Sequence, residues 1–416
     1  MCAQFAFNLL LAKTTGAAGV GEYYIFLAVV LGMGVFAKYG TDVSAIRLLA
    51  VSMPDKNSGR GGAPIDLDVD SLWSSLFLFV NITVALVCVF GSTAIYFLGD
   101  QNSNSILLGY VLAAVLFQAL LAFSCASLRG LKQPVSAALI ESLGLPVLNI
   151  SAIVGLYLLD VISIDNVIRT YVLVSLILYV SAQLVLLKSI KPVWPIKILS
   201  FISTMFLRNL PLLSIALMTY ISHWSAIWII EIYMGSSDVG IYNIAWRLVV
   251  VAGFVGLAVK NINAPYFSRL YAEKDVSALQ KRASAATSVI WIMSIPLFLI
   301  LYIFSEKILG IFGQEFISGA RVLQVLVLGQ IFRTCCGPVG YMLLMTGHER
   351  EYNLINTISA AVIIISALFL VSIWGVLGVA IAYSVGTSLQ NIIAWAMVKD
   401  KVGVMCLPFY RRGATL

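Results

Sequence analysis

Long apolar runs constrain this chain more than any other feature of its sequence. A helix needs about 20 apolar residues to cross a bilayer. Eleven runs indicate such helices, and they cover residues 23–37, 72–98, 106–128, 135–159, 167–187, 206–230, 241–263, 287–312, 322–345, 352–373 and 376–398. Residues 1–12 are apolar too but form half a span, so either residues are missing upstream of Met1 or the first helix is broken, and a truncated or mis-started N-terminus is the favoured interpretation.

The composition supports this interpretation. Of the 416 residues, 61% are hydrophobic and 11% are charged, whereas soluble proteins have roughly 45–50% and about 25%. A soluble fold of this size cannot bury that excess, so an ordinary cytosolic enzyme, a disordered chain and a fibrous repeat are excluded. The prediction is an all-α polytopic membrane protein with about 12 transmembrane helices, the first incomplete. The six cysteines show no paired spacing in outer loops, and no disulfide framework, metal or other cofactor is expected.

Basic residues predict the orientation of these helices. Nineteen of the 26 Lys and Arg residues fall in alternate loops and in the C-terminal tail, while four fall in or beside the loops of the other side. Cytoplasmic loops carry the excess of Lys and Arg in membrane proteins. The C-terminus is therefore expected in the cytoplasm of a cell (inner or plasma) membrane, and the net charge of +7 requires no nucleic acid partner.

An internal repeat divides the chain. Residues 16–26 (GAAGVGEYYIF) and 235–245 (GSSDVGIYNIA) share five identities at an offset of 219, and 128–130 echo 345–347 at an offset of 217. The offset equals six spans of the same orientation, which predicts a parallel duplication of two six-helix lobes around a central cleft. The expected lobes are residues 1–190 (helices 1–6) and 205–416 (helices 7–12), joined by a cytoplasmic linker at 191–204.

The order and spacing of several short motifs resemble a known family. These motifs are residues 10–24, 239–248, 265–273, 310–323 and 375–380. They resemble the Wzx-like polysaccharide flippases of the multidrug/oligosaccharidyl-lipid/polysaccharide export superfamily, over nearly the whole chain. Two departures stand out: much of the first helix is absent, and residues 222–225 (SHWS) occupy a place where many relatives carry an acidic residue.

Charged residues within the predicted spans are candidates for function, because each costs at least ~2.5–3.5 kcal/mol at the membrane centre. Five cations are predicted to bind substrate in a cationic cleft: Arg333, Arg247, Arg208, Lys260 and Lys38. Arg333 lies nearest the midplane, where it is least able to reach the surface. For the other four, the alternative is a side chain that extends to the headgroups or anchors a helix end.

Two further groups could carry a proton. Glu141 lies inside the fifth span and His223 in the outer third of the seventh, and both side-chain types couple transport to protons. The alternative is a buried hydrogen-bonded pair that fixes helix packing. Residues 66–70 (DLDVD) resemble the acidic motif of a glycosyltransferase, but they lie in an inner loop and are interpreted as solvated.

The resemblance implies a flippase that moves a polyprenyl-pyrophosphate-linked oligosaccharide to the outer leaflet by alternating access, for surface polysaccharides such as the O-antigen of lipopolysaccharide. Its partners would be this lipid, the bilayer, and a polysaccharide polymerase with its chain-length machinery. One alternative is a cation-coupled drug antiporter of the same superfamily, which would favour acidic cavity residues. Another is a membrane polysaccharide polymerase, which would need long outer loops. Common catalytic motifs are missing from the sequence, so no enzyme activity is expected.

Overall fold

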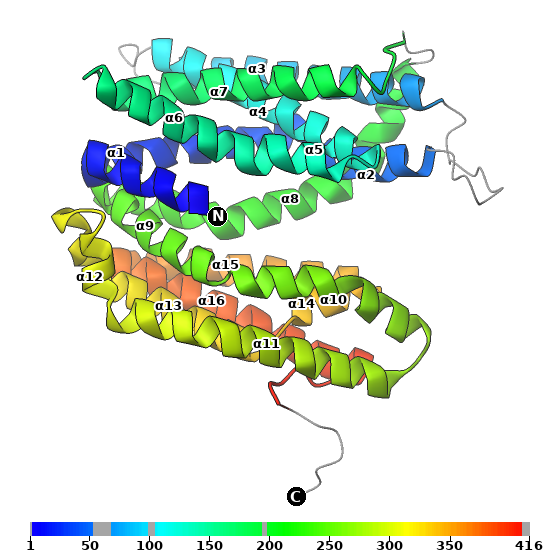
Figure 1. Ribbon diagram of the computed structural model, residues 1–416, viewed down its shortest axis with the longest axis vertical. Coiled ribbons are helices and arrows are strands. Elements are labelled where there is room, and N and C mark those ends of the chain that lie inside the picture. The colour runs from blue at the N-terminus through cyan, green and yellow to red at the C-terminus, as the bar shows by residue number, and fades with distance from the viewer. Residues whose placement is uncertain (1, 53–67, 99–104, 194–197, 410–416) are drawn as a thin grey trace, which may run out of the picture. The chain divides into compact units, whose positions relative to one another are not determined.

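The computed structural model describes residues 2–52, 68–98, 105–193 and 198–409, and within these ranges every regular element is a helix (Figure 1). Ten helices are long and apolar enough to cross a membrane, or eleven if one bent pair counts as a single span. The chain is thus an all-α, multi-pass membrane protein. Two compact units are defined by their internal contacts: unit 1 holds Leu11–Ile25 and Ile221–Leu416, and unit 2 holds Cys2–Leu10 and Phe26–Tyr220.

Unit 2 is built around a central helix. It contains the two ends of α1 (Cys2–Lys38) and the first part of α8 (Ile198–Met234). Its complete helices are α2 (Thr41–Ser52), α3 (Val69–Leu98), α4 (Ser105–Gly130), α5 (Pro134–Ala138), η1 (Leu139–Gly144), α6 (Leu145–Leu158) and α7 (Ile164–Leu186). Helix α4 packs against α2, α3 and α7. The predicted linker at 191–204 falls partly outside the described residues, as do residues 66 and 67 of the acidic motif at 66–70.

Unit 1 contains the remaining helices. They are the end of α8, α9 (Ser236–Ala252), α10 (Phe254–Ala272), α11 (Val276–Ile303), α12 (Ser305–Gly310), η2 (Gln314–Gly319), α13 (Ala320–Cys335), α14 (Val339–Met345), α15 (Glu349–Trp374), α16 (Val376–Met397) and η3 (Val398–Val402). Helix α13 lies between α11 and α16, and α16 packs along α15 (Figure 1). Apolar side chains fill these contacts.

Three glycines mark breaks in the helices. Gly16 (φ 68°) divides α1 into two helical pieces, between the apolar runs 1–12 and 23–37. Helices α9 and α10 meet at Gly253 with a bend of 42°. The predicted span 322–345 is divided into α13 and α14, because Gly337 takes a φ of 70° and Pro338 follows it. Glycine adopts positive φ readily, and proline donates no backbone hydrogen bond to the preceding turn.

The repeated sequence has a repeated backbone conformation. Gly16 (φ 68°, ψ −173°) and Gly235 (φ 96°, ψ 175°) each lie directly before a helix. The carboxylate of Glu315 accepts a hydrogen bond of 2.9 Å from the backbone N–H of Ala17 and so satisfies a donor at the start of that helix. Both repeats therefore begin with the same turn.

The C-terminal segment, residues 403–409, is tied to α11. The Gln280 side chain donates to the carbonyl of Met405 (2.7 Å) and accepts from its N–H (2.8 Å). The Ser288 hydroxyl accepts from the N–H of Phe409 at 2.8 Å. Cys406 is fully buried, with its sulfur 3.9 Å from that of Met342 on α14. The C-terminal segment therefore packs against both α11 and the short helix α14.

Candidate functional site

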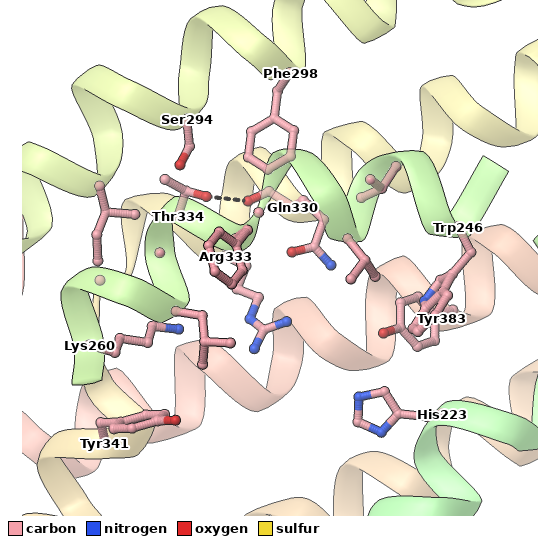
Figure 2. A pocket seen from close by; sticks show the side chains of 18 residues that line it. His223, Trp246, Lys260, Ser294, Phe298, Gln330, Arg333, Thr334, Tyr341 and Tyr383 are labelled. Carbon is pink, nitrogen blue, oxygen red and sulfur yellow. Dashed lines mark hydrogen bonds between the residues drawn. The ribbon is translucent and has the colours of Figure 1, made fainter. Parts of the chain in front are cut away.

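A cavity of about 300 Å³ lies within unit 1. Side chains from α8, α9, α10, α11, α13, α14 and α16 line it (Figure 2). Such a volume is at the lower end of the roughly 300–1,000 Å³ typical of small-molecule sites. The helix breaks contribute directly, because Gly253 and Gly337 both belong to the lining.

Two cations face the cavity. Arg333 of α13 and Lys260 of α10 point into the same space in Figure 2. Neither has a hydrogen bond or an ion pair among the described residues, and no Asp or Glu is found among the described lining residues. Like charges that share a site of low dielectric need a counter-ion. The arrangement is suited to binding an anion.

The break at Gly337 helps to place Arg333. A Cβ on Gly337 would lie 2.3 Å from the Thr287 hydroxyl oxygen of α11, so only glycine permits this approach. Helix α13 therefore ends two residues after Arg333, against α11. An arginine near the end of a helix is compatible with the partial negative charge there.

The other end of the cavity is neutral and aromatic. Trp246 of α9, Tyr383 of α16 and His223 of α8 lie there in Figure 2, with Gln330 between them and Arg333. The rings of His223 and Trp246 meet edge to face, with centroids 6.3 Å apart. Sequence reasoning missed Trp246, Tyr383 and Gln330. The position of Gln330, three residues before Arg333, is the signal that could have found it, because side chains at this spacing share a helix face.

Three of the seven predicted site residues meet in this cavity: Arg333, Lys260 and His223. Arg247 lies on α9 beside Trp246 but is absent from the described lining. Its guanidinium lies over the rings of Tyr24 (4.9 Å) and Trp246 (5.6 Å). Cation–π contacts of this kind stabilise a buried charge, so Arg247 supports the wall of the cavity.

The other predicted residues belong to unit 2. Lys38 forms an ion pair of 3.5 Å with Asp42, one turn further along the chain. Glu141 pairs with Arg129 of α4, and Arg208 is exposed. Lys38, Glu141 and Arg208 are not among the described residues that line the cavity. Within the described residues, no group of three or more His, Cys, Asp or Glu side chains could hold a metal ion.

The fold defines the class of protein. An inward-facing multidrug resistance MATE family transporter of the MOP superfamily superposes with a TM-score of 0.72 at 14% identity, over 96% of this chain and 94% of that chain. The lipid II flippase MurJ in its inward closed conformation gives a TM-score of 0.73 at 17% identity, over 96% and 85%. At these identities the likeness shows the fold alone, which is that of the MATE and MurJ transporters.

Sequence comparison then gives the family. A family model described as "Polysaccharide biosynthesis protein" matches residues 1–271, and one described as "MatE" matches residues 211–370. A segment of 175 residues is 25% identical to the "Probable low-salt glycan biosynthesis flippase Agl15" of Haloferax volcanii, and it spans 42% of this chain but only 37% of that protein. The chain belongs to the polysaccharide biosynthesis protein family, the Wzx-like flippases of the MOP superfamily. As the sequence predicts, this is a family of transporters and not of enzymes.

Proposed function

We propose that this protein moves a polyprenyl-pyrophosphate-linked oligosaccharide from the cytoplasmic to the outer leaflet, for surface polysaccharides such as O-antigen. The observation that carries the proposal is the cavity in which Arg333 and Lys260 have no acidic partner among the described residues. An anionic headgroup cannot cross hydrocarbon unaided. Arginine binds phosphate oxygens through two parallel hydrogen bonds, and lysine adds a point charge. The names of the two flippases among the relatives point to the same substrate class.

The proposed cycle is alternating access between two six-helix lobes, 1–190 and 205–416, with the C-terminus in the cytoplasm. The shared turn at Gly16 and Gly235 supports the parallel duplication on which such a cycle depends. The lipid tail stays in the membrane while the cavity binds the headgroup. A polymerase and its chain-length machinery would receive the product. His223 lines the same cavity and is the proposed proton-coupling group.

A cation-coupled drug antiporter is the second candidate. The MatE match to residues 211–370 and the likeness to a multidrug transporter favour it. The charge of the cavity opposes it, because cationic drugs need carboxylates and the described lining has none. Overproduction of the protein should leave resistance to cationic drugs unchanged if the flippase proposal is right.

The central experiment replaces Arg333. Arg333→Ala should abolish surface polysaccharide per molecule of membrane-inserted protein, and Arg333→Lys should retain part of it, because lysine keeps the charge but not the planar fork. Arg321→Ala is the matched control, since Arg321 is an exposed cation on the same helix, away from the cavity. Full polysaccharide output per molecule from Arg333→Ala would overturn the assignment of Arg333 as the phosphate-binding residue.

A further inference from the structure

Arg282 of α11 is held in one orientation by two side chains of α10. Its guanidinium carbon lies 4.2 Å from the centroid of the Tyr266 ring, and its Nε–H donates a hydrogen bond of 2.7 Å to the side-chain oxygen of Asn263. Asn263 is buried, and its amide nitrogen donates in turn to the carbonyl of Val259 at 2.7 Å. A ring contact and a hydrogen bond at Nε together fix the plane of the guanidinium.

The far edge of this guanidinium is left without a protein partner. Among the described residues, Arg282 forms no ion pair, and its two terminal nitrogens donate no hydrogen bond. Arg269, at the same end of α10, differs because its Nε lies 2.8 Å from a carboxylate oxygen of Glu273, which neutralises its charge. The terminal N–H groups of an arginine match two oxygens of a phosphate. Arg282 therefore presents a preorganised edge for binding an anion.

Arg282 lies near one boundary of the membrane. The apolar run that is predicted to cross the membrane begins at residue 287, which is about 7.5 Å further along the helix. Headgroup phosphates lie just outside the hydrocarbon core, so the guanidinium can reach them. The basic residues predict that this boundary is the cytoplasmic one. Anionic lipids give that surface a negative potential, and basic sites between membrane helices bind their headgroups.

An exposed apolar stripe leads from Arg282 along α11. Val289, Met293 and Ile300 follow Arg282 by about two, three and five helical turns, so all four side chains share one face of the helix. The three apolar side chains are exposed, and they are not among the described residues that line the cavity. An exposed apolar face of a membrane span contacts acyl chains. The guanidinium and the stripe therefore match the two parts of one phospholipid molecule.

We infer that Arg282, Asn263 and Tyr266 form a binding site for an anionic phospholipid of the bilayer. Arg282 binds the phosphate of the headgroup, while Asn263 and Tyr266 position its guanidinium. An acyl chain of the same lipid lies along Val289 and Met293. None of these five residues is among the described lining of the cavity, so the site is separate from the one that carries the proposed function and does not depend on it.

The test measures binding of fluorescent phosphatidylglycerol to the purified full chain in a neutral detergent. Arg282→Ala should weaken binding about tenfold, and Arg282→Lys should retain part of the affinity, because lysine keeps the charge but not the planar fork. Lys281→Ala is the matched control, since Lys281 is the neighbouring exposed cation, and it should bind like the wild-type protein. Tyr266→Leu keeps every charge but removes the ring, and it should also weaken binding.

Three outcomes would overturn the inference. Equal weakening by Lys281→Ala and Arg282→Ala would report only the net charge at this end of the protein. Displacement of the lipid by an equal concentration of sn-glycerol 3-phosphate would show that the ligand is a free phosphate. Unchanged phosphatidylglycerol affinity in Arg282→Ala, together with weaker binding of polyprenyl pyrophosphate, would assign Arg282 to the transported substrate.

Thermal unfolding without lipid checks the fold of each variant. If Arg282→Ala lowers the unfolding midpoint, Arg282→Gln decides the outcome, because glutamine keeps a polar side chain at this position and removes only the charge and the fork. Wild-type affinity in Arg282→Gln would overturn the site, and a loss of about tenfold would support it.

Discussion

Gly21 and Gly240 have reciprocal positions in unit 1. A Cβ on Gly21 would lie 1.7 Å from the carbonyl oxygen of Ser236, and a Cβ on Gly240 would lie 2.1 Å from the carbonyl oxygen of Ala17. Gly240 is the counterpart of Gly21 in the second repeat, and Ser236 is the counterpart of Ala17, each at the offset of 219. The two contacts are therefore the same contact made once by each repeat. This is the relation expected of two duplicated segments around a local twofold axis, and it supports a parallel duplication of the chain.

Substitution of these glycines should destabilise the protein. Gly21→Ala and Gly240→Ala each force a methyl group against a backbone oxygen, and overpacking of this kind costs roughly 1–3 kcal/mol or more. Thermal unfolding in detergent should show lower midpoints for both variants. Gly155→Ala is the control, because nothing lies within 4 Å of its Cβ position in α6. Unchanged midpoints for Gly21→Ala and Gly240→Ala would show that the contact is loose.

The predicted topology can be checked with fusions. The bias of 19 basic residues against four predicts that a reporter active only outside the cytoplasm gives no signal after residue 412. The same reporter should be active after residue 102, in a loop outside the described residues. A reversed pattern would invert the proposed direction of every helix.

The ion pair between Arg129 and Glu141 is expected to be structural. Both side chains are about one third exposed, and pairs of this kind contribute about 0–1 kcal/mol. Glu141→Gln should lower stability slightly and leave polysaccharide output per molecule unchanged. The double exchange Arg129→Glu with Glu141→Arg should restore stability. If Glu141→Gln lowered polysaccharide output per molecule and the double exchange did not restore that output, Glu141 would again be the candidate proton carrier.

Cys406 should resist thiol reagents. Burial, with a smaller contribution from Cys336, raises the pKa of the Cys406 thiol to about 12, so it stays protonated from neutral pH to pH 9, and the thiolate is the reactive form. With Cys406 as the sole cysteine, maleimide should label the folded protein slowly at pH 9 and fully after unfolding. Gln280→Ala, which removes both bonds to Met405, should accelerate labelling.

A positive control for that experiment is Ser268→Cys in a cysteine-free background, because Ser268 is exposed on α10. Its labelling should be rapid at pH 8 and insensitive to Gln280→Ala. Rapid labelling of Cys406 in the folded protein would show that the C-terminal segment does not stay docked on α11.

Local features were predictable from the sequence, and tertiary neighbours were not. Hydropathy located the helices, and the isolated depth of Arg333 marked it as a candidate, which the structure places in the lining of the cavity. The cavity neighbours Ser294 and Tyr383 carry no such mark, since a serine or tyrosine in an apolar helix looks the same whether it faces lipid, a neighbour or a cavity. Trp246 was missed because aromatic residues in membrane helices usually mark interfaces. The ion pair of Glu141 depends on how α4 and η1 pack, which no sequence period encodes.

All described residues that line the cavity fall between His223 and Tyr383, one uninterrupted stretch of the chain. The residues of the proposed binding cavity are therefore encoded by one continuous part of the gene. Recombination between relatives, with one crossover upstream of residue 223 and one downstream of residue 383, would transfer that whole set of side chains at once. Chimeras built in this way should inherit the cargo preference of the donor of that part of the gene, whatever the source of the first half of the chain.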